Sequence, residues 1–592
     1  MSKILDKVLY VDLGECKYEI AEQPELFDRF LGGSGLAIEL LLKECPEGID
    51  PYAPENPVIL APGPLGGLFP SAGKTVATFK SPITGNLGES HAGGRLASCL
   101  RLAGYGALVI KNSAATPTFL EITDGEVVFR DASPLKGFSS LEVERRLRGC
   151  AAVARLQSVI SIGAAGENRV AYACANVDRY NYFGRLGLGA VLGSKNLKVI
   201  SIVGSGSIMV PDPKFYKKTF RRLYAEEIET DKMAKYHFTG TPANVLVLNE
   251  IKALPTKNFQ KGTFECAEAL SGENLGEKWV ERKVSCPLCP TGCMHIAKIR
   301  QPFASGYEYE PLDVYHNYES IYALGSNLCI RTSEEVLKLI HKANIYGIDT
   351  MLLGNVLGWA TEAFENGLIN QQHTAGLAPK WGDTETYLAI IDNIVSASNE
   401  FYAKLAEGVE KAAEAYGGQD FAIALGGNGP AGYHTGYASV LGTIVGARHS
   451  HNNNGGYDID QKMLHQNLNQ SHVVSELIKE NEWRYVLTSL VICLFARRIY
   501  NEKNVVEALK AVGIERSVKE LQKLGRQIYA RAFEFKFREG FDFNKVKVPR
   551  RLFESLTSNG KIDEAVFRDM LKEYVKAEFD SALQGQKSSK PA

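Results

Sequence analysis

The sequence predicts an α+β protein in which a sheet-rich part, residues 1–207, is followed by two mainly helical parts, residues 208–420 and 421–592. Two changes of pattern support this division. Short β-branched runs separated by glycine turns fill the chain up to about residue 205, and apolar residues with helical periodicity follow. The length of 592 residues also exceeds what a single hydrophobic core usually supports, so we expect about three packed units.

The first part consists of strand-like runs that end at glycines. These runs are VLYVDL, PVILAPG, KTVATF, GALVIKN, TFLEITDG, SVISIG and LKVISIVGSG. Glycine clusters lie at 31–36, 62–67, 90–95 and 184–198. Glycines allow a backbone to approach a bulky ligand, and their free N–H groups can cradle anionic oxygens, although they can equally serve only to turn the chain.

The remaining chain shows the spacing of amphipathic helices. Periodic segments occur at 213–228, 333–348, 350–367 and 386–417. A glycine-rich passage at 425–458 interrupts the helical pattern, and we take it as the boundary between the second and third units.

Composition excludes several functions. Lys+Arg 67 nearly balances Asp+Glu 68, and the net charge of -1 gives no reason to expect binding to nucleic acid or to an acidic membrane. The N-terminus lacks the apolar core of a signal peptide, and no run of about 18 apolar residues occurs. We therefore expect a cytoplasmic protein whose 11 cysteines remain thiols and are available as metal ligands.

The strongest local motif is CPLCPTGC. Cys286, Cys289 and Cys293 follow the spacing C-x2-C-x3-C, and the prolines and glycine between them bend the chain so that three sulfurs can converge. An iron–sulfur cluster would need a fourth cysteine, which local spacing does not identify. A zinc site that adds His295 is an alternative. A radical-SAM cluster, whose usual spacing is the reverse, and unliganded thiols, which would oxidise readily, are less favoured.

Colinear blocks along the chain resemble the aldehyde:ferredoxin oxidoreductase family of tungsten or molybdenum bis-pterin enzymes. The blocks are PYAPENPVILAPGPLGG, SAGKTVATFKSPITGNLGESHAGG, LAGYGALVIKN, GAVLGSKNLKVISI, CPLCPTGC, YESIYALGSN and FKFREGFDFNKVKVPRRLFES. The resemblance implies a pterin-binding first domain and an oxidoreductase that converts an aldehyde to a carboxylic acid. Electrons would leave through a [4Fe-4S] cluster to ferredoxin or to a partner iron–sulfur subunit, in a homodimer or hetero-oligomer.

The same resemblance assigns the cofactor residues. It gives Cys493 as the fourth cluster ligand beside Cys286, Cys289 and Cys293. One pterin segment is NIYGID, where Gly347 and Asp349 agree with the family and Asn344 replaces an acid. The other is TSLVIC, from Thr488 through Ile492 to Cys493, where Thr488 replaces Asp and Val491 replaces Gly. The loss of a carboxylate removes a strong acceptor for pterin N–H groups.

Further positions match segments that contact the pterins and their phosphates. Lys74 takes the place of an arginine that bridges cluster and pterin, so it keeps the charge but loses the two-pronged geometry. The phosphate-contacting segments are matched by His91, Ala92, Gly93, Gly94 and Arg185. The resemblance also implies a Mg2+ ion that bridges the pterin phosphates.

Glu319 and His449 match the family's catalytic residues. The glutamate would assist attack of water or oxo on the carbonyl carbon, and a protonated histidine would bind the carbonyl oxygen. Glu308 is the fallback for Glu319, and we interpret His451 and Tyr318 as additional pocket residues. The acidic and aromatic stretch GYEYEPLDVYHNYES before ALGSN is expected to reshape the pocket.

Two further functions are compatible with the sequence. The chain would be a family-related reductase of an acyl-CoA or of a hydroxy or oxo acid, because its pterin segments depart from the family. Alternatively, it would be an electron-transfer or assembly subunit that retains the fold without the metal.

Overall fold

The computed structural model describes residues 5–148, 156–303, 306 and 308–587. Its first part contains a mixed sheet in the order β2-β1-β6-β3-β4-β5. The β1–β6 pair is parallel and the other neighbours are antiparallel. The strands are β1 (Lys7–Asp12), β2 (Lys17–Glu22), β3 (Val58–Ala61), β4 (Thr75–Lys80), β5 (Leu87–Ala92) and β6 (Ala107–Lys111).

A second sheet has the order β11-β10-β9-β12-β7-β8. Only its β7–β12 pair is parallel. The strands are β7 (Thr118–Ile122), β8 (Val127–Asp131), β9 (Leu156–Ser161), β10 (Ala175–Val177), β11 (Asn181–Phe183) and β12 (Leu197–Gly204). Apolar side chains of both sheets share one core, in which Leu9 and Leu108 of the first sheet belong with Ile160 and Ile200 of the second.

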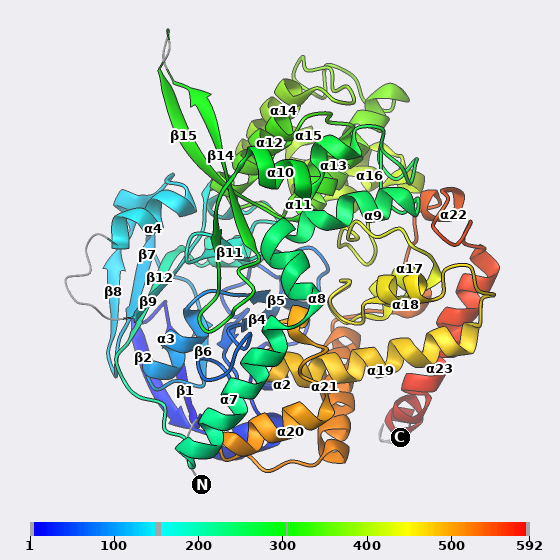
Figure 1. Cartoon of the computed structure of the whole chain (residues 1–592). Helices are drawn as coiled ribbons and strands as arrows, with labels where there is room; N and C mark the ends of the chain where they lie inside the picture. The colour runs from blue at the N-terminus through cyan, green and yellow to red at the C-terminus, as the bar shows by residue number, and fades with distance from the viewer. Residues whose placement is uncertain (1–4, 149–155, 304–305, 307, 588–592) are drawn as a thin grey trace.

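Short helices connect and cover these strands. They are α1 (Pro24–Phe30), α2 (Gly33–Glu44), α3 (Leu96–Leu102), α4 (Ser140–Arg148), α5 (Ala164–Glu167) and α6 (Leu188–Ser194). Helix α2 packs on β3 and β4, whereas α3 packs on β9 and β12. Figure 1 shows this sheet-rich part in blue and cyan on one side of the molecule.

The second part of the chain begins with α7, whose 16 residues match the predicted periodic segment. Asp212 caps its N-terminus by accepting hydrogen bonds from the backbone N–H groups of Lys214 and Phe215. The helices here are α7 (Pro213–Ile228), α8 (Asp231–Ala234), α9 (Asn244–Glu250), α10 (Gly272–Lys278), α11 (Tyr318–Leu324), α12 (Ser333–Tyr346), α13 (Thr350–Glu365), α14 (Thr384–Ser396), α15 (Glu400–Glu407) and α16 (Val409–Tyr416).

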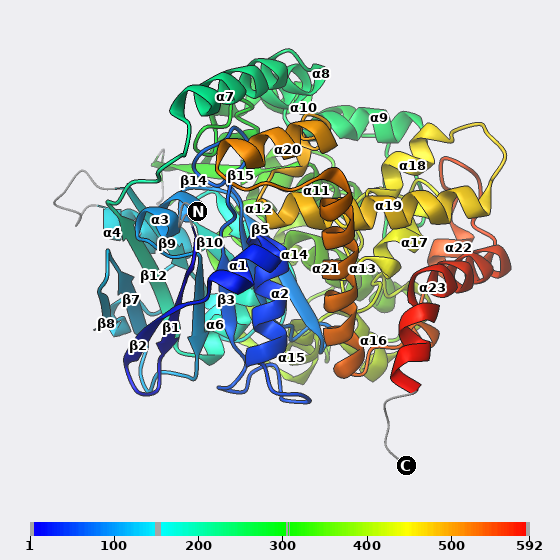
Figure 2. The ribbon, with the colours of Figure 1, turned by 90° about the horizontal axis from the view of Figure 1, so that it is seen from below.

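The last part is also helical. Its helices are α17 (Tyr437–Val445), α18 (Gly456–Lys462), α19 (Gln470–Ser489), α20 (Glu502–Ala511), α21 (Val518–Arg538), α22 (Arg551–Glu554) and α23 (Glu564–Lys587). Helix α19 packs against α21, α23 and the N-terminal helix α2. Figure 2 shows α2, α19 and α21 gathered in the middle of the molecule, so the two ends of the sequence share one core.

The contact between α2 and the end of α19 depends on glycine. A side chain on Gly33 would collide with the carbonyl oxygen of Thr488, and one on Gly63 would lie 2.7 Å from the carbonyl oxygen of Ser489. The N–H of Gly35 donates to the Ser489 hydroxyl at 3.0 Å. Part of the first two glycine clusters therefore serves close packing between distant segments.

The predicted α+β class, with a sheet-rich first part and a mainly helical remainder, is confirmed. A three-stranded antiparallel sheet of β13 (Val280–Val284), β14 (Met294–Pro302) and β15 (Tyr309–His316) was not predicted. It projects from the helical part in Figure 1. The predicted periodic segment 386–417 is divided among α14, α15 and α16, because Ala397 and Gly408 take positive φ values.

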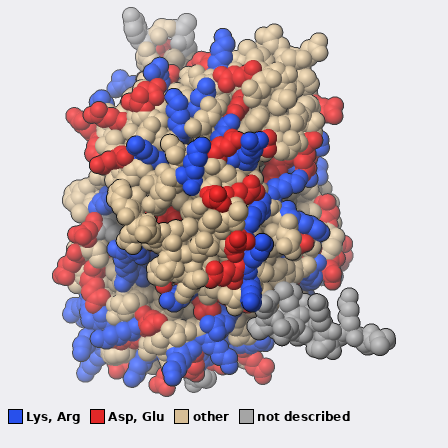
Figure 3. Space-filling model, turned by 90° about the vertical axis from the view of Figure 1, so that its right-hand side faces the viewer, with Lys and Arg blue, Asp and Glu red and all other residues tan. Residues whose placement is uncertain are grey.

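None of the helices in the described part of the chain has the length and apolar character needed to cross a membrane. On the face shown in Figure 3, acidic and basic side chains are interspersed. This mixture agrees with the net charge of -1.

Candidate functional site

The cysteine loop lies between β13 and β14. It turns sharply because Leu288 and Gly292 have φ values of 60° and 56°, and the N–H of Cys289 donates to the carbonyl of Cys286 at 3.1 Å. Met294 and Ile296 on β14 pack with Cys286 and Cys293. Since side chains alternate along a strand, His295 points to the opposite face. Its Nε2 lies 3.2 Å from the carbonyl oxygen of His237.

The structure brings Cys493 to this loop. The N–H of Cys493 donates to the carbonyl of Ser71 at 2.7 Å, and the Ser71 hydroxyl lies 3.3 Å from the sulfur of Cys289. On the other side, the N–H of Gly94 donates to the sulfur of Cys286 at 3.4 Å. A side chain on Gly93 would lie 2.7 Å from the same sulfur, so a glycine is required there.

Lys74 lies among these thiols. Its backbone N–H donates to the carbonyl of Val491 at 3.2 Å. Burial alone would lower the pKa of Lys74, but the charges of Cys493, Cys286 and Cys293 raise it above its ordinary value. Lys74 is therefore the cation of the cysteine centre.

The thiol arrangement fits a cluster better than a single ion. Within the described ranges, no group of three or more His, Cys, Asp and Glu side chains could hold one metal ion. Because His295 also points away, the zinc alternative has no support. Burial raises the pKa of Cys493 to about 11, so a metal that binds this thiol must displace its proton. Four cysteines are suitable ligands for an iron–sulfur cluster, and an amide N–H and a lysine lie beside them.

Glu319 lies in the first turn of α11. Asn317 caps this helix, and its side chain accepts a hydrogen bond from the N–H of Ser320 at 2.9 Å. The Tyr433 hydroxyl donates to Glu319 Oε1 at 3.4 Å, and His451 Nε2 lies 3.6 Å from the same oxygen. Burial raises the pKa of Glu319 above its ordinary value. The pair of a carboxylate with a raised pKa and an imidazole is typical of proton-transfer sites.

The structure places the other predicted catalytic residue, His449, elsewhere. His449 is buried, with Nε2 2.9 Å from Lys536 Nζ and Nδ1 3.2 Å from the carbonyl oxygen of Thr443. Burial and Lys536 hold the pKa of His449 well below its ordinary value. Neither nitrogen is directed toward Glu319, so the histidine that accompanies Glu319 in this geometry is His451 and not His449.

A group of buried arginines surrounds His451. Burial, followed by the charges of Arg185, Arg484, Arg448 and Arg497, lowers the pKa of His451 to about 3. The His451 imidazole is therefore neutral here, whereas the histidine expected from the sequence to be protonated is His449. Arg448 Nε, Arg484 Nη2 and His451 Nδ1 are buried without a hydrogen-bond partner. Buried N–H groups of arginines that lack a hydrogen-bond acceptor suit an anionic ligand, such as a phosphate-bearing cofactor.

The first predicted pterin segment ends α12. Gly347 caps this helix with φ 74°, and the Asn344 amide donates to the carbonyl of Tyr315 at 3.0 Å. Asp349 caps α13 by accepting from the N–H of Met351 at 2.9 Å. Arg185 Nε lies 2.8 Å from Asp349 Oδ2, which connects this segment to the arginine group.

The second predicted segment ends α19 with a similar turn. The N–H of Ile492 donates to the carbonyl of Leu487 at 3.0 Å, as that of Ile348 donates to Ala343 after α12. Val491 has φ 57°, a conformation that costs a β-branched residue roughly 1–2 kcal/mol. The backbone therefore retains a glycine geometry although the residue is valine. The Thr488 hydroxyl donates to the carbonyl of Tyr485 at 3.4 Å and supplies no carboxylate.

His91 and Ala92 end strand β5, which precedes Gly93 and Gly94. His91 Nε2 lies 2.7 Å from Glu89 Oε1, and Glu89 also accepts from the Ser34 hydroxyl at 2.7 Å. Burial, followed by Arg448, lowers the pKa of His91 to about 4. The predicted phosphate-contacting segment therefore lies between the cysteine centre and the arginine group.

Several residues of the site were not predicted. The rings of Tyr433 and Tyr457 stack at 4.3 Å, and Tyr433 lies 5.1 Å from Tyr318 and 5.6 Å from His451. Tyr433 lies in the passage GPAGYHTGY, which we interpreted as a domain boundary. Its glycines could have indicated a loop packed against a ligand, but the pattern does not show where the rings point.

Glu308, the fallback for Glu319, lies near the exposed end of the β14–β15 hairpin, where the N–H of Phe303 donates to its carbonyl at 3.2 Å. Residues 306 and 308–311 of the acidic stretch are exposed, so the expectation that the stretch reshapes the pocket is wrong for these residues, and residue 307 lies outside the described part of the chain. Tyr315, in its second half, lies close to Lys74 and Cys293.

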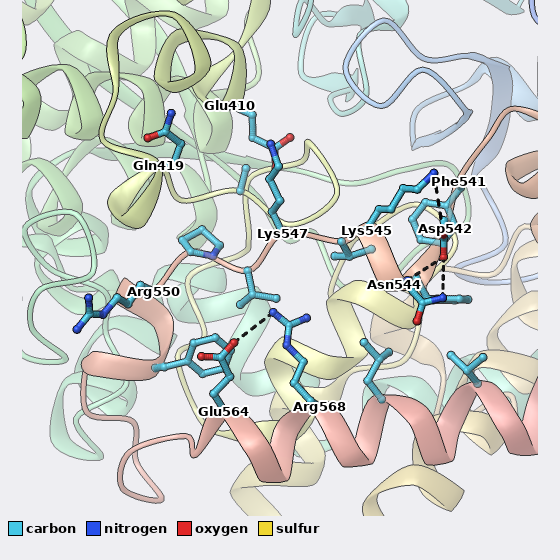
Figure 4. A pocket seen from close by; sticks show the side chains of 18 of the residues that line it. Glu410, Gln419, Phe541, Asp542, Asn544, Lys545, Lys547, Arg550, Glu564 and Arg568 are labelled. Carbon is cyan, nitrogen blue, oxygen red and sulfur yellow. Dashed lines mark hydrogen bonds and ion pairs between the residues drawn. The ribbon is translucent and has the colours of Figure 1, made fainter.

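A cavity of about 1240 Å³ is separate from this site. It lies between α23, the segment 537–553 and residues 410–424. Figure 4 shows Lys547 and Arg568 extending into it. The ring of Phe541, which lines this cavity, lies 5.5 Å from that of His449. A smaller cavity of about 20 Å³ is lined in part by Tyr433, His451 and Tyr457.

Comparisons with protein families match almost the whole chain. Residues 8–204 match the N-terminal domain of aldehyde ferredoxin oxidoreductase, and residues 218–578 match its domains 2 and 3. The tungsten-containing aldehyde ferredoxin oxidoreductase of Pyrococcus furiosus is 31% identical over 592 aligned residues, which cover 95% of this chain and 94% of that protein. The corresponding protein of Thermococcus kodakarensis is 32% identical with the same coverage.

Two other similar proteins carry names that refer to different substrates. A WOR-like subunit of an aliphatic sulfonate oxidoreductase from Pyrococcus furiosus is 30% identical over 431 residues, 69% of this chain and 66% of that protein. The active-site complex BamBC of benzoyl coenzyme A reductase, solved with 1,5-dienoyl-CoA, has a TM-score of 0.81, with 21% identity and coverage of 97% of this chain and 94% of the other. At that identity, the structural similarity shows the fold alone.

Proposed function

The chain belongs to the aldehyde ferredoxin oxidoreductase family, and on this premise we propose that it oxidises an aldehyde to a carboxylic acid at a tungsten or molybdenum centre held by two pterins. Electrons then pass through a [4Fe-4S] cluster to ferredoxin or to an iron–sulfur subunit. The family supports the general class of oxidoreductase, and the arrangement of side chains supports the particular reaction.

One observation carries this proposal: Glu319 and His451 meet next to buried arginines and close to the four cysteines. Tyr236 lies near both regions, because, in addition to burial, the charges of Glu319 and Cys493 both raise its pKa. Its ring stacks on that of Phe495 at 4.4 Å. Glu319 and Cys493 therefore both lie near this one aromatic side chain. A redox enzyme needs this proximity to move electrons away from its substrate.

The chain's own residues fit the cofactors that the family uses. Cys286, Cys289, Cys293 and Cys493 would hold the cluster. The anionic groups of the pterins would be bound by the unpartnered nitrogens of Arg448 and Arg484, by Arg185 and by the segment His91 to Gly94. Asn344 and Thr488 would supply polar groups at the ends of the two pterin segments. When bound, the metal centre would accept two electrons from the substrate.

Glu319 would act as the general base. Its raised pKa makes the carboxylate a better proton acceptor for a water molecule that attacks the carbonyl carbon. The Tyr433 hydroxyl holds the carboxylate in place. His451 would face the carbonyl oxygen of the substrate. An anionic cofactor among the arginines would offset their charges, and the pKa of His451 would then rise.

A second candidate is the reduction of an aromatic acyl group. The observation that favours it is the set of tyrosine rings, Tyr318, Tyr433 and Tyr457, around Glu319. Rings of this kind can stack on a planar substrate.

The test is metal analysis of protein matured with its cofactors, combined with benzyl viologen reduction by a panel of aliphatic and aromatic aldehydes. We expect tungsten or molybdenum in the protein together with aldehyde-dependent viologen reduction. Metal without aldehyde activity, but with oxidation of reduced viologen by an aromatic acyl-CoA, would favour the second candidate. Absence of both metals would contradict both functions and leave the electron-transfer subunit.

A further inference from the structure

The cysteine loop reaches the protein surface at Leu288. This residue lies between Cys286 and Cys289, and 42% of it is exposed. Its φ of 60° turns the loop outward at this point. A single exposed leucine is ordinary, but this one lies next to a candidate cluster ligand and gains meaning if other apolar side chains surround it.

More apolar side chains are exposed on the segment that wraps this loop. At the end of α7, Glu227 accepts from the Thr291 hydroxyl at 3.0 Å, and His237 Nδ1 lies 3.0 Å from the carbonyl oxygen of Thr291. The neighbours of these two residues face the solvent: Ile228 is 47% exposed and Phe238 is 68% exposed. The loop is therefore bordered by an exposed apolar area.

Basic residues extend this area along α7. Lys214, Lys217, Lys218 and Arg221 are exposed, and within the described residues none of them forms an ion pair with an acid. Lys214, Arg221 and Ile228 follow one another at intervals of seven residues, so they lie on one face of the helix. Each lies about 10 Å along the helix axis from the next. Arg222, on another face, pairs with Glu226 and Glu507.

Asp212 caps the first turn of α7 and Glu226 pairs with Arg222, and the remaining exposed acids lie at the far end of this row. Glu229 and Asp231 follow the last turn of α7, so the positive charge is concentrated on its first turns. Figures 1 and 2 agree in placing α7 and α8 in the outer layer of the molecule. The surface thus has an apolar centre at the cysteine loop and a positive rim along α7.

We propose that Leu288, Ile228, Phe238 and the basic face of α7 form the docking surface for an acidic iron–sulfur electron carrier. The inference rests on the proposed function, in which electrons leave through the four cysteines. The apolar centre brings the carrier against the loop that holds Cys289, and the basic rim attracts its negative charge. An apolar centre with a charged rim is the usual anatomy of a transient protein interface.

Charge reversal on α7 tests the proposal. We expect Lys217→Glu combined with Lys218→Glu to raise the Kd for an acidic 2[4Fe-4S] ferredoxin at least tenfold at low salt, measured by surface plasmon resonance with the matured protein. The difference should shrink as ionic strength increases, because salt screens exposed charges. Aldehyde-dependent reduction of benzyl viologen, which needs no docking protein, should remain unchanged.

Lys572→Glu combined with Lys576→Glu on α23 is the matched control, since it changes the net charge equally at the right of Figure 1, away from α7. A second variant, Phe238→Ser, removes apolar area without altering charge and should weaken ferredoxin binding at all salt concentrations. Equal ferredoxin affinity in the α7 pair and the control would overturn the docking surface. Loss of viologen activity in the unmodified protein would count against the proposed function instead, and the binding comparison would still decide the docking surface.

Discussion

His451 Nε2 lies 3.6 Å from Glu319 Oε1, and this contact joins the start of α11 to the loop after α17. It brings a carboxylate with a raised pKa together with an imidazole that burial and the nearby arginines keep neutral. The Tyr433 hydroxyl shares the same carboxylate oxygen. The arrangement defines where a substrate would react, and most of the following predictions depend on it.

Replacing each of the two histidines in turn separates a role in catalysis from a role in packing. We expect His451→Asn to lower kcat for aldehyde oxidation by about 10²-fold, because it removes the imidazole beside Glu319. His449→Asn should retain most of the activity but lower the free energy of unfolding by about 1–3 kcal/mol, because it leaves Lys536 with fewer partners. Steady-state kinetics and thermal unfolding of both variants check this. A large loss of kcat in the His449 variant alone would return the catalytic role to that residue.

Glu319→Gln should lower kcat by about 10²–10⁴-fold, because the amide cannot accept the proton from water. The metal content should stay the same, since Glu319 is not one of the proposed cofactor ligands. The control is Glu308→Gln near the end of the β14–β15 hairpin, for which we expect normal turnover. Normal turnover in the Glu319 variant would exclude it as the base.

Tyr433→Phe should move the acid limb of the kcat/KM profile to higher pH by roughly 0.5–1 units. The Tyr433 hydroxyl stabilises the Glu319 carboxylate and so lowers its pKa against the effect of burial. Without the hydroxyl the pKa rises, and the base is deprotonated only at higher pH. Tyr437→Phe, whose hydroxyl binds the N–H of Asp563, should leave the profile unchanged. An unshifted limb in the Tyr433 variant would limit Tyr433 to a packing role.

Cys289→Ser should remove or strongly weaken the visible absorbance of the iron–sulfur cluster, because the hydroxyl is a poor replacement for a thiolate ligand. Cys266→Ser serves as the control, since Cys266 lies outside the cysteine centre. Absorption spectra and iron analysis of anaerobically purified protein check the result. An unchanged spectrum in the Cys289 variant would refute the ligand assignment.

Glu578→Gln should stabilise the protein at pH 8 but have little effect near pH 5. Burial, followed by repulsion from Glu482, raises the pKa of Glu578 to about 7. Between about pH 4.5 and 7 the folded state therefore holds a proton that the unfolded state has released, so stability falls as the pH rises. Because Glu578 is partly exposed, we expect a gain of only about 1 kcal/mol at pH 8. Thermal unfolding at the two pH values measures it, and an equal effect at both would contradict the assigned pKa.

Much of the fold could be predicted because its signals are local. The apolar spacing from 213 to 228 and the cap at Asp212 define α7 without reference to the rest of the chain. Strands β13 and β15 were missed because their residues are largely polar and exposed or half-buried, as in KYEIAE of β2. Such strands are stabilised by pairing with a neighbour, which a single segment does not reveal.

The site could be predicted only where distant segments carry their own signal. The thiols of Cys286, Cys289 and Cys293 have such a signal in their spacing. Which of His449 and His451 faces Glu319 depends instead on the geometry of a turn. His449 has φ 48°, and two residues in a turn of this kind point in directions that sequence spacing does not determine. Tyr433, Arg448 and Arg484 meet only after several helices have packed, so no local pattern identified these three, whereas Arg185 lies in the segment GRLGLG that the sequence singled out.

The close approach of Gly33 and Gly63 to the end of α19 has a consequence for the order of biosynthesis. The glycines leave the ribosome early, but the turn on which they pack, and Cys493 beyond it, is made after more than four-fifths of the chain. Until then the N-terminal half has no partner for this part of its surface. The cysteine centre therefore cannot be complete until the segment after α19 has been made, and insertion of a cluster must follow synthesis of Cys493.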